Sequence, residues 1–227
     1  MQTREKIVIK AENGQVIELE PSVFTKAQLR YLPFKRLIDI LGAFCALVIL
    51  FPVFLITAIA VRLDSRGSIF FRHVRVGRNG IPFEMLKFRS MVDDALIKEK
   101  ELHHLSDTDG PFFKMKDDPR VTKVGRFIRK YSVDELPQFW NVLLGHMSLV
   151  GPRPLVYREI YELEGHAKNL SVKPGLTCFW QVSGRSNSSA EQRIELDAKY
   201  IEKLSLAIDI ILLCKTPMAI VKGEGAY

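Results

Sequence analysis

The sequence predicts an α+β fold, predominantly α-helical, with a membrane-inserted helical segment ahead of a globular domain. Three observations point to this class. First, 47% of the 227 residues are hydrophobic, which permits a core of ordinary size and excludes a disordered chain. Second, residues 41–61 form an apolar run without a charge. Third, the rest of the chain combines helical segments with short β-hairpin signals.

The first predicted elements precede the apolar run. Residues 5–20 alternate β-forming side chains around an Asn-Gly pair, which predicts a β-hairpin. Residues 22–40 are expected to form a helix that leads into the apolar run. Within this helix, Asp39 follows Lys35 and Arg36 by four and three residues. This spacing predicts an ion pair suited to a membrane interface.

The apolar run, Leu41 to Val61, is 21 residues long and has Pro52 at its midpoint. As a straight helix it measures ~30 Å, about the thickness of the hydrocarbon layer. Both flanks are basic: Lys26, Arg30, Lys35 and Arg36 precede the run, and Arg62, Arg66, Arg72 and Arg75 follow it. The positive-inside rule then favours a helix that kinks and leaves on the face it entered. Because proline is also tolerated in spanning helices, a kinked span stays open.

The segment 69–89 is expected to form a second hairpin around a glycine-containing turn at 77–80. The glycines do not form a phosphate loop, since no Lys-Ser or Lys-Thr pair follows and no helix begins there. Alternate side chains of a strand point to one face. The odd-numbered Arg75, Lys87 and Arg89 are therefore expected to lie together.

The remainder of the chain is predicted to be mainly helical. Helices are expected at residues 91–106, 121–131, 133–145, 154–168, 189–204 and 206–221. A short strand is expected at 176–182. The last helix is apolar on nearly all sides but too short to span comfortably, so we expect it at the membrane interface or in the core.

The net charge of +7 implies an anionic partner, such as nucleic acid, acidic lipid or a phosphorylated substrate. The charge is uneven, because residues 62–90 carry seven Lys and Arg against two acidic residues. The cysteines, Cys45, Cys178 and Cys214, fit neither a disulfide framework nor a zinc spacing. A reducing compartment is therefore expected.

The acidic pair Asp134-Glu135 is the strongest chemical signal. Ser132 lies three residues before Glu135, which is also the pattern of a capping box at a helix start. Basic residues precede the pair: Lys123, Arg126, Arg129 and Lys130. Arginines bind phosphate bidentately, and carboxylates suit a hard cation such as Mg²⁺. Arg153, held between two prolines, is expected to have a fixed direction and a binding role.

Several ordered motifs accompany these features. They are RVGRNG at 75–80, KFRSM at 87–91, DPRVTKVGRFIRKYSVDELPQ at 118–138, GHMSLVGPRP at 145–154, KPGLTCFWQVSGRS at 173–186 and LDAKY at 196–200. With the basic-flanked apolar segment, they resemble the bacterial sugar transferases, the monotopic polyprenyl-phosphate hexose-1-phosphate (phosphoglycosyl) transferases. The resemblance covers about residues 34–217.

The resemblance implies a re-entrant helix-break-helix kinked at Pro52 and a cytoplasmic domain with a small β-hairpin and amphipathic interfacial helices. The implied division is an extension at 1–30, the membrane segment at 31–62 and a catalytic domain at 63–227. Asp134 and Glu135 are implied as catalytic residues: Asp134 as the nucleophile, and Glu135 as a residue that helps to hold Mg²⁺ or moves a proton. Both are implied as Mg²⁺ ligands. Further implied substrate- or phosphate-binding positions are Arg75, Lys87, Arg129, Arg153, Arg185, Asp197 and Asp209.

The implied reaction moves a sugar-1-phosphate from a UDP-sugar to a polyprenyl (undecaprenyl) phosphate, through an aspartyl-phosphosugar intermediate, and releases UMP. The implied location is the cytoplasmic face of the bacterial inner membrane, with membrane lipid as a partner, no nucleic acid, and a homodimer left open. Two alternatives remain: a membrane-associated glycosyltransferase that releases a nucleoside diphosphate, and a non-enzymatic basic module that binds the membrane.

Overall fold

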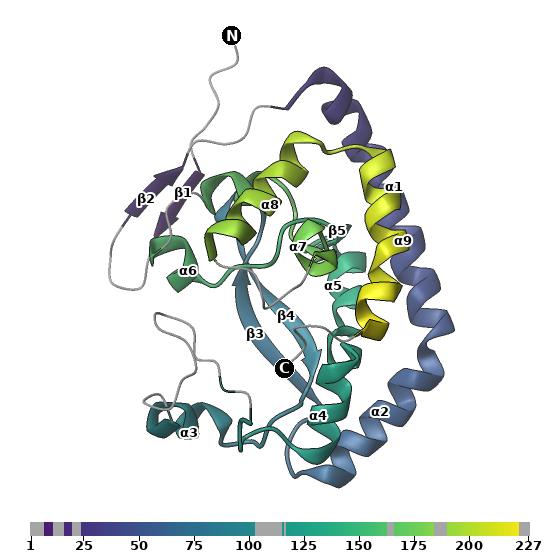
Figure 1. The fold of residues 1–227 in the computed structure, drawn as a ribbon, viewed down its shortest axis with the longest axis vertical. Coiled ribbons are helices and arrows are strands. Elements are labelled where there is room, and N and C mark those ends of the chain that lie inside the picture. Colours follow the sequence, from purple (N-terminus) through teal and green to yellow (C-terminus); the bar gives the residue numbers. More distant parts are fainter. Residues whose placement is uncertain are drawn as a thin grey trace.

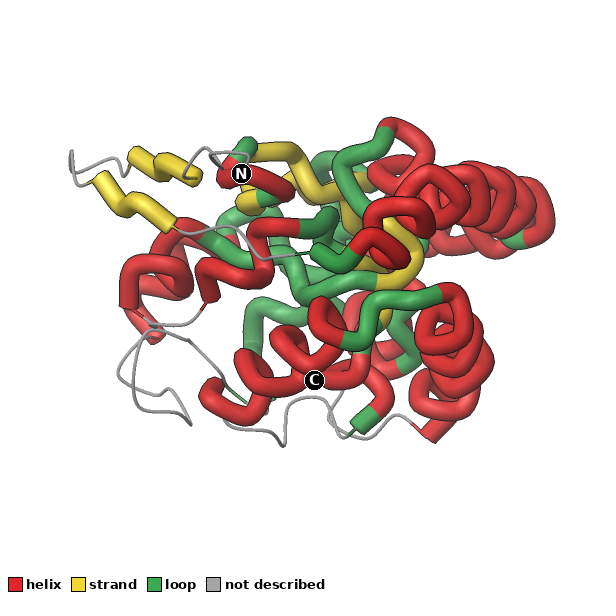
Figure 2. Tube along the Cα trace, turned by 90° about the horizontal axis from the view of Figure 1, so that it is seen from above, coloured by secondary structure: helices red, strands yellow, loops and turns green. Residues whose placement is uncertain are grey.

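The structure is a computed structural model that describes residues 7–10, 16–19, 24–102, 115, 117–162, 166–183 and 190–222. Over these residues it confirms an α+β fold that is mostly helical. The strands form three separate two-stranded sheets. A long bent pair of helices borders one side of the molecule, and the hairpin of β1 (Ile7–Lys10) and β2 (Val16–Leu19) projects from the opposite side (Figures 1 and 2).

The bent pair consists of α1 (Lys26–Ile49) and α2 (Phe51–Asp64), which are separated by Leu50 and bent by 62°. Pro52 lies in the first turn of α2, where its missing N–H has no helical partner to lose. The predicted break near this proline is therefore confirmed. No single helix in the described part of the chain is long and apolar enough to cross a membrane, whereas the bent pair is when counted together. The implied boundary at residue 30, between the N-terminal extension and the membrane segment, falls inside α1.

The bent pair exposes many large apolar side chains. The most exposed are Phe34, Leu41, Phe44, Val48, Ile49, Phe51, Ile56 and Leu63. A surface of this kind marks an interaction with lipid or with another protein. Membrane insertion of the pair stays a prediction.

A buried ion pair fixes α1 to the last helix, α9 (Leu206–Lys222), which runs beside it (Figure 1). The Lys35 ammonium donates to Asp209 at 2.5 Å. The hydroxyls of Tyr31 and Tyr200 donate to the same carboxylate at 2.7 and 2.8 Å. The carboxylate therefore has a cation and two hydroxyl donors, which offset the cost of its burial.

The expected ion pair of Asp39 is not formed. Its carboxylate instead accepts hydrogen bonds from the Ser148 hydroxyl and the Leu149 N–H, both at 2.9 Å. The Arg36 guanidinium donates to the carbonyls of Val142 and Leu143 at the end of a neighbouring helix. These partners lie more than 100 residues away, so side-chain spacing within one helix could not reveal them. They attach α1 to the domain at several points.

The second predicted hairpin is confirmed. Strands β3 (Phe70–Val76) and β4 (Pro82–Phe88) pair antiparallel, and the 3₁₀ turn η1 (Arg78–Gly80) joins them. Asn79 and Gly80 adopt positive φ values there, as a tight hairpin turn requires. The Asn141 side chain fixes β4 by accepting from the Leu86 N–H and donating to the Glu84 carbonyl.

Other elements surround this hairpin. They are α3 (Ala95–Leu102), α4 (Lys123–Lys130), η3 (Val133–Glu135), α5 (Gln138–Leu144), β5 (Ser148–Val150), α6 (Tyr157–Glu162), η4 (His166–Ser171), β6 (Gly175–Thr177), α7 (Phe179–Val182) and α8 (Ala190–Glu202). Strands β5 and β6 pair parallel. The main core lies between α1, α5, α8, α9 and the hairpin, and its largest fully buried side chain is Tyr200.

Two expected elements have different forms. The strand expected at 176–182 covers only Gly175–Thr177 and is followed by α7. The helix expected at 154–168 is shorter in the described residues and is followed by the 3₁₀ helix η4.

The helix expected at 133–145 is also wrong as a single element. Its first part is the 3₁₀ turn η3, and α5 begins only after Pro137. An α-helix through residue 137 would lack the hydrogen bond to residue 133, and the proline ring would clash with that carbonyl. Ser132 has a left-handed conformation (φ 53°) and forms no side-chain cap, so the capping box that its spacing from Glu135 resembles is not formed.

Candidate active site

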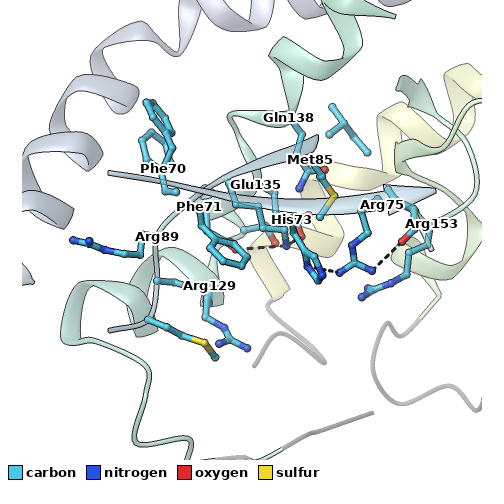
Figure 3. A pocket seen from close by; sticks show the side chains of 18 of the residues that line it. Phe70, Phe71, His73, Arg75, Met85, Arg89, Arg129, Glu135, Gln138 and Arg153 are labelled. Carbon is cyan, nitrogen blue, oxygen red and sulfur yellow. Dashed lines mark hydrogen bonds and ion pairs between the residues drawn. The ribbon is translucent and has the colours of Figure 1, made fainter. Parts of the chain in front are cut away.

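The acidic pair lines a cavity of about 500 Å³. Its walls include the β3–β4 hairpin, the η3 turn, the Pro-Arg-Pro segment, β6, α7 and α9. Elements far apart in sequence thus meet at one site. Figure 3 shows the side chains gathered around Glu135.

Lys87 connects the hairpin to the acidic pair. Its ammonium donates to Glu135 Oε1 at 2.6 Å and lies 3.8 Å from Asp134 Oδ2. Asp134 is only 7% exposed. Residues 133–135 form a 3₁₀ turn, and the α-helix expected to begin here begins only at Gln138. Asp134 therefore does not lie at the N-terminus of an α-helix. The nearby positive charge comes from Lys87 and Arg129 instead.

Burial raises the pKa of Asp134 to about 6, because desolvation penalises its charged form. The charges of Lys87 and Arg129 oppose this rise, and the charge of Glu135 adds to it. Asp134 is therefore mostly ionised at neutral pH but more basic than an ordinary carboxylate. Both properties favour a nucleophile.

Arg75 and Arg153 form a cationic wall of the cavity. Arg75 donates to the Pro154 carbonyl at 3.3 Å and lies 3.6 Å from Glu159. Burial, then the neighbouring Arg153, lower the pKa of Arg75 to about 10, so it stays charged at neutral pH. The Arg153 guanidinium stacks over the Trp180 ring at 5.0 Å. The pair presents two oriented guanidinium groups of the kind that bind phosphates.

The other expected basic residues separate into two groups. Arg129 lines the cavity, whereas Lys123, Arg126 and Lys130 are exposed on α4. Arg89 lines the same cavity as Arg75 and Lys87, as predicted, and its guanidinium donates to the Ser65 carbonyl and hydroxyl. Arg185 lies outside the described residues.

The two other acidic candidates lie away from the cavity wall. Asp209 is occupied by Lys35 and the two tyrosines. Asp197 is buried and accepts a hydrogen bond from Asn169 at 3.1 Å. Burial raises the pKa of Asp197 to about 7, and hydrogen bonding to the Arg153 backbone opposes that rise. Asp197 is thus placed to hold the backbone of a cavity arginine, and its direct contact with substrate stays a prediction.

The sequence interpretation missed His73 and Gln138, which also line the cavity. His73 Nδ1 lies 3.3 Å from the Arg75 guanidinium. The signal for His73 was available, because it shares the odd-numbered strand face with Arg75. Gln138 follows the 3₁₀ turn, and its position depends on a break that we did not predict.

The carboxylates of the site suit a Mg²⁺ ion if substrate oxygens supply further ligands to the ion. Among the described residues, no group of three or more His, Cys, Asp or Glu side chains is placed to hold a metal. Asp134 and Glu135 nevertheless supply two adjacent carboxylates beside a cationic cavity. Mg²⁺ commonly binds through one or two carboxylates plus substrate phosphates and keeps several waters.

A buried, ionisable aspartate in a cation-lined cavity has the electrostatics expected of a site for a phosphorylated ligand. The chain belongs to the bacterial sugar transferase family, which it matches over residues 30–223. The resemblance of its ordered motifs to this family is thereby confirmed.

Three relatives illustrate the family. The chain is 44% identical to the UDP-galactose-lipid carrier transferase of Erwinia amylovora over 202 residues, which are 85% of this chain and 41% of that protein. It is 42% identical over 205 residues to the undecaprenyl-phosphate galactose phosphotransferase of Salmonella typhimurium, with 85% and 41% covered. It is 39% identical over 201 residues to the exopolysaccharide production protein ExoY of Sinorhizobium fredii, with 85% and 88% covered. The chain thus spans less than half the length of the first two relatives.

Proposed function

We propose that the protein transfers a sugar-1-phosphate from a UDP-sugar to a polyprenyl phosphate at the cytoplasmic face of the bacterial inner membrane. The observation that carries this proposal is the ionisable Asp134 within a cavity lined by Lys87, Arg75, Arg129 and Arg153. The names of the relatives supply the sugar nucleotide and the undecaprenyl phosphate. The bent pair α1–α2 would enter the membrane as a re-entrant element.

The proposed reaction has two displacements at the same phosphorus. A carboxylate oxygen of Asp134 bonds to the phosphorus that carries the sugar, and the bond from that phosphorus to the oxygen shared with UMP breaks. UMP leaves with that oxygen. A phosphate oxygen of the acceptor then attacks the same phosphorus, and the Asp134 carboxylate leaves. The product is a polyprenyl diphosphate sugar.

The cavity residues have distinct roles in this proposal. Arg75 and Arg153 hold the donor phosphates, since their guanidinium groups are already oriented. Lys87 keeps Asp134 ionised by lowering its pKa against the effect of burial. Asp134 and Glu135 would hold Mg²⁺, which neutralises phosphate charge when bound. Catalysis would then depend mostly on position and charge, as is usual for phosphoryl transfer.

Product analysis tests this function against the glycosyltransferase and binding-module alternatives. Purified protein with undecaprenyl phosphate, Mg²⁺ and a panel of UDP-hexoses is expected to release UMP, because the bond between the two donor phosphates breaks. Chromatography of the nucleotides distinguishes UMP from UDP. Release of UDP would indicate transfer of the sugar alone, and release of neither with the whole panel would favour a binding module.

The pH profile should report Asp134. Below its pKa of about 6 the carboxyl group is protonated and cannot attack, so kcat/KM for the donor should fall about tenfold per pH unit. Above that pKa the rate should level off. The Lys87→Met variant removes a charge that lowers this pKa, so its acidic limb should move to higher pH. UMP release from pH 5 to 8.5 measures both profiles, and identical limbs in the two proteins would contradict the assignment.

A further inference from the structure

The side chains that line the cavity change from aromatic to charged along β3. Phe71, His73 and Arg75 occupy alternate positions of β3 and all line the cavity. The rings of Phe71 and His73 are 5.9 Å apart, and His73 lies 3.3 Å from Arg75. The distance from Phe71 to Arg75 along the strand is about 13 Å. Over this length the wall passes from an aromatic ring to a guanidinium group, and Figure 3 shows the phenylalanines and Arg153 at opposite ends.

The aromatic end is continuous with the apolar helix pair. Phe70 stacks on Phe88 with ring centroids 5.3 Å apart, and Phe88 meets Phe54 of α2 edge-on at 5.5 Å. Phe88 is buried, but Phe70 and Phe71 are 44% and 39% exposed and both line the cavity. A row of aromatic rings thus runs from α2 to the cavity rim.

The reactive group lies between the two ends. Phe71 pairs across the hairpin with Lys87, whose ammonium contacts Glu135 and lies near Asp134. Arg75 and Arg153 lie beyond His73, on the side of the cavity away from α2 (Figure 3). A highly charged diphosphate is favoured at the arginine end, and an uncharged hydrocarbon chain is favoured at the phenylalanine end.

We propose that Phe70 and Phe71 form the surface on which the first isoprene units of the acceptor rest, while the donor diphosphate lies at the Arg75–Arg153 end. This inference rests on the proposed function. It places the two substrates on opposite sides of Asp134, so that the acceptor phosphate reaches the phosphorus while its chain continues toward α2. Phe70 and Phe71 are positioning residues that bind the start of the prenyl chain and so align the acceptor phosphate.

The shape of the aromatic end favours a flexible chain over a flat ring. Phe70 and Phe71 are neighbours in a strand, so their side chains point to opposite faces, and Figure 3 shows the two rings on different sides of the strand. They form an edge instead of one flat platform. A nucleobase or sugar ring stacks on a single aromatic face, whereas an isoprenoid chain can lie across an edge.

The test separates the two halves of the reaction. Adduct formation is measured without acceptor, as protein-bound label from the radiolabelled UDP-hexose that supports UMP release. Acceptor KM is measured with undecaprenyl phosphate and with the short-chain farnesyl phosphate. The double variant Phe70→Ser/Phe71→Ser should raise KM for both acceptors about tenfold, because both carry the first isoprene units, and should change the rate of adduct formation much less.

Two further variants control for structure. Val74→Ser changes a somewhat more exposed residue of the same strand (50%) that does not line the cavity, and it should leave acceptor KM unchanged. Phe70→Leu/Phe71→Leu keeps an apolar surface and should restore most of the acceptor affinity. Recovery with Leu would also show that the Ser effect is not due to misfolding.

Three outcomes would overturn the inference. Unchanged acceptor KM in the Ser variant would show that the chain lies elsewhere. A raised donor KM with normal acceptor KM would assign the phenylalanines to the base or sugar. A loss with undecaprenyl phosphate alone would place the contact beyond the three isoprene units of farnesyl phosphate. A wild-type protein that forms no adduct and releases no UMP would instead contradict the proposed function itself.

Discussion

The Asp134→Asn variant is expected to lose at least about 10³-fold in sugar-phosphate transfer, because an amide cannot supply the attacking oxygen. Loss of activity should accompany a gain in stability. Burial raises the pKa of Asp134 from 3.8 to about 6 in the folded protein. The stability that this carboxyl group contributes is present below pH 3.8, where it is neutral, and is lost as pH rises through 6. At pH 7.5 the asparagine avoids this cost.

Two measurements check this result. UMP release and protein-bound label give the loss of activity, and thermal unfolding at pH 7.5 and pH 5 gives the stability. The rise in Tm should be a few degrees at pH 7.5 and smaller at pH 5. Asp117→Asn, at an exposed position, should change neither activity nor Tm. Turnover of the Asp134→Asn variant close to that of the wild type would refute the nucleophile.

The Asp209→Leu variant is expected to lose about 3–5 kcal/mol of unfolding free energy, since it leaves the Lys35 ammonium buried without its counter-charge. The two side chains are 10% and 4% exposed. Tyr31 and Tyr200 would also lose the acceptor of their hydroxyls. This prediction assigns Asp209 to the attachment of α1, in contrast to the substrate role implied by family resemblance.

A double-mutant cycle distinguishes the two roles. Lys35→Met combined with Asp209→Leu removes both charges, so it should recover much of the stability lost in either single variant. Denaturant unfolding in detergent measures all four proteins. Removing one side of the exposed Arg72–Glu84 pair by Arg72→Met should cost below about 1 kcal/mol. If Asp209→Leu abolishes transfer at unchanged stability, the carboxylate acts on substrate instead.

Local signals in the sequence predicted local features well. The hairpin of residues 69–89 followed from alternation and a turn that needs positive φ, and both are present. The helix break followed from the chemistry of Pro52. The cavity position of Lys87 followed from strand parity. In each case the deciding interaction lies within the element itself.

Features set by distant partners could not be predicted in this way. Asp39 and Lys35 fit an ion pair by spacing, but each has a better partner more than 100 residues away. The four basic residues before the acidic pair look equivalent in sequence, yet only Arg129 among them lines the cavity, because α4 turns the others outward. The 3₁₀ turn at Asp134 was not predicted, because the spacing of Ser132 and Glu135 indicated a helix start and the effect of Pro137 on that helix was left out.

One small core joins the acidic turn to the bent helix pair. Val133 and Leu136, on either side of Asp134 and Glu135, pack in the same cluster as Phe54 and Val61 of α2. For a chain inserted as proposed, the height of the reacting carboxylate above the bilayer is therefore set by how deeply α2 sits. The depth of the lipid headgroups would then determine whether the acceptor phosphate is level with Asp134. A thicker or thinner leaflet would move the acceptor phosphate away from that carboxylate.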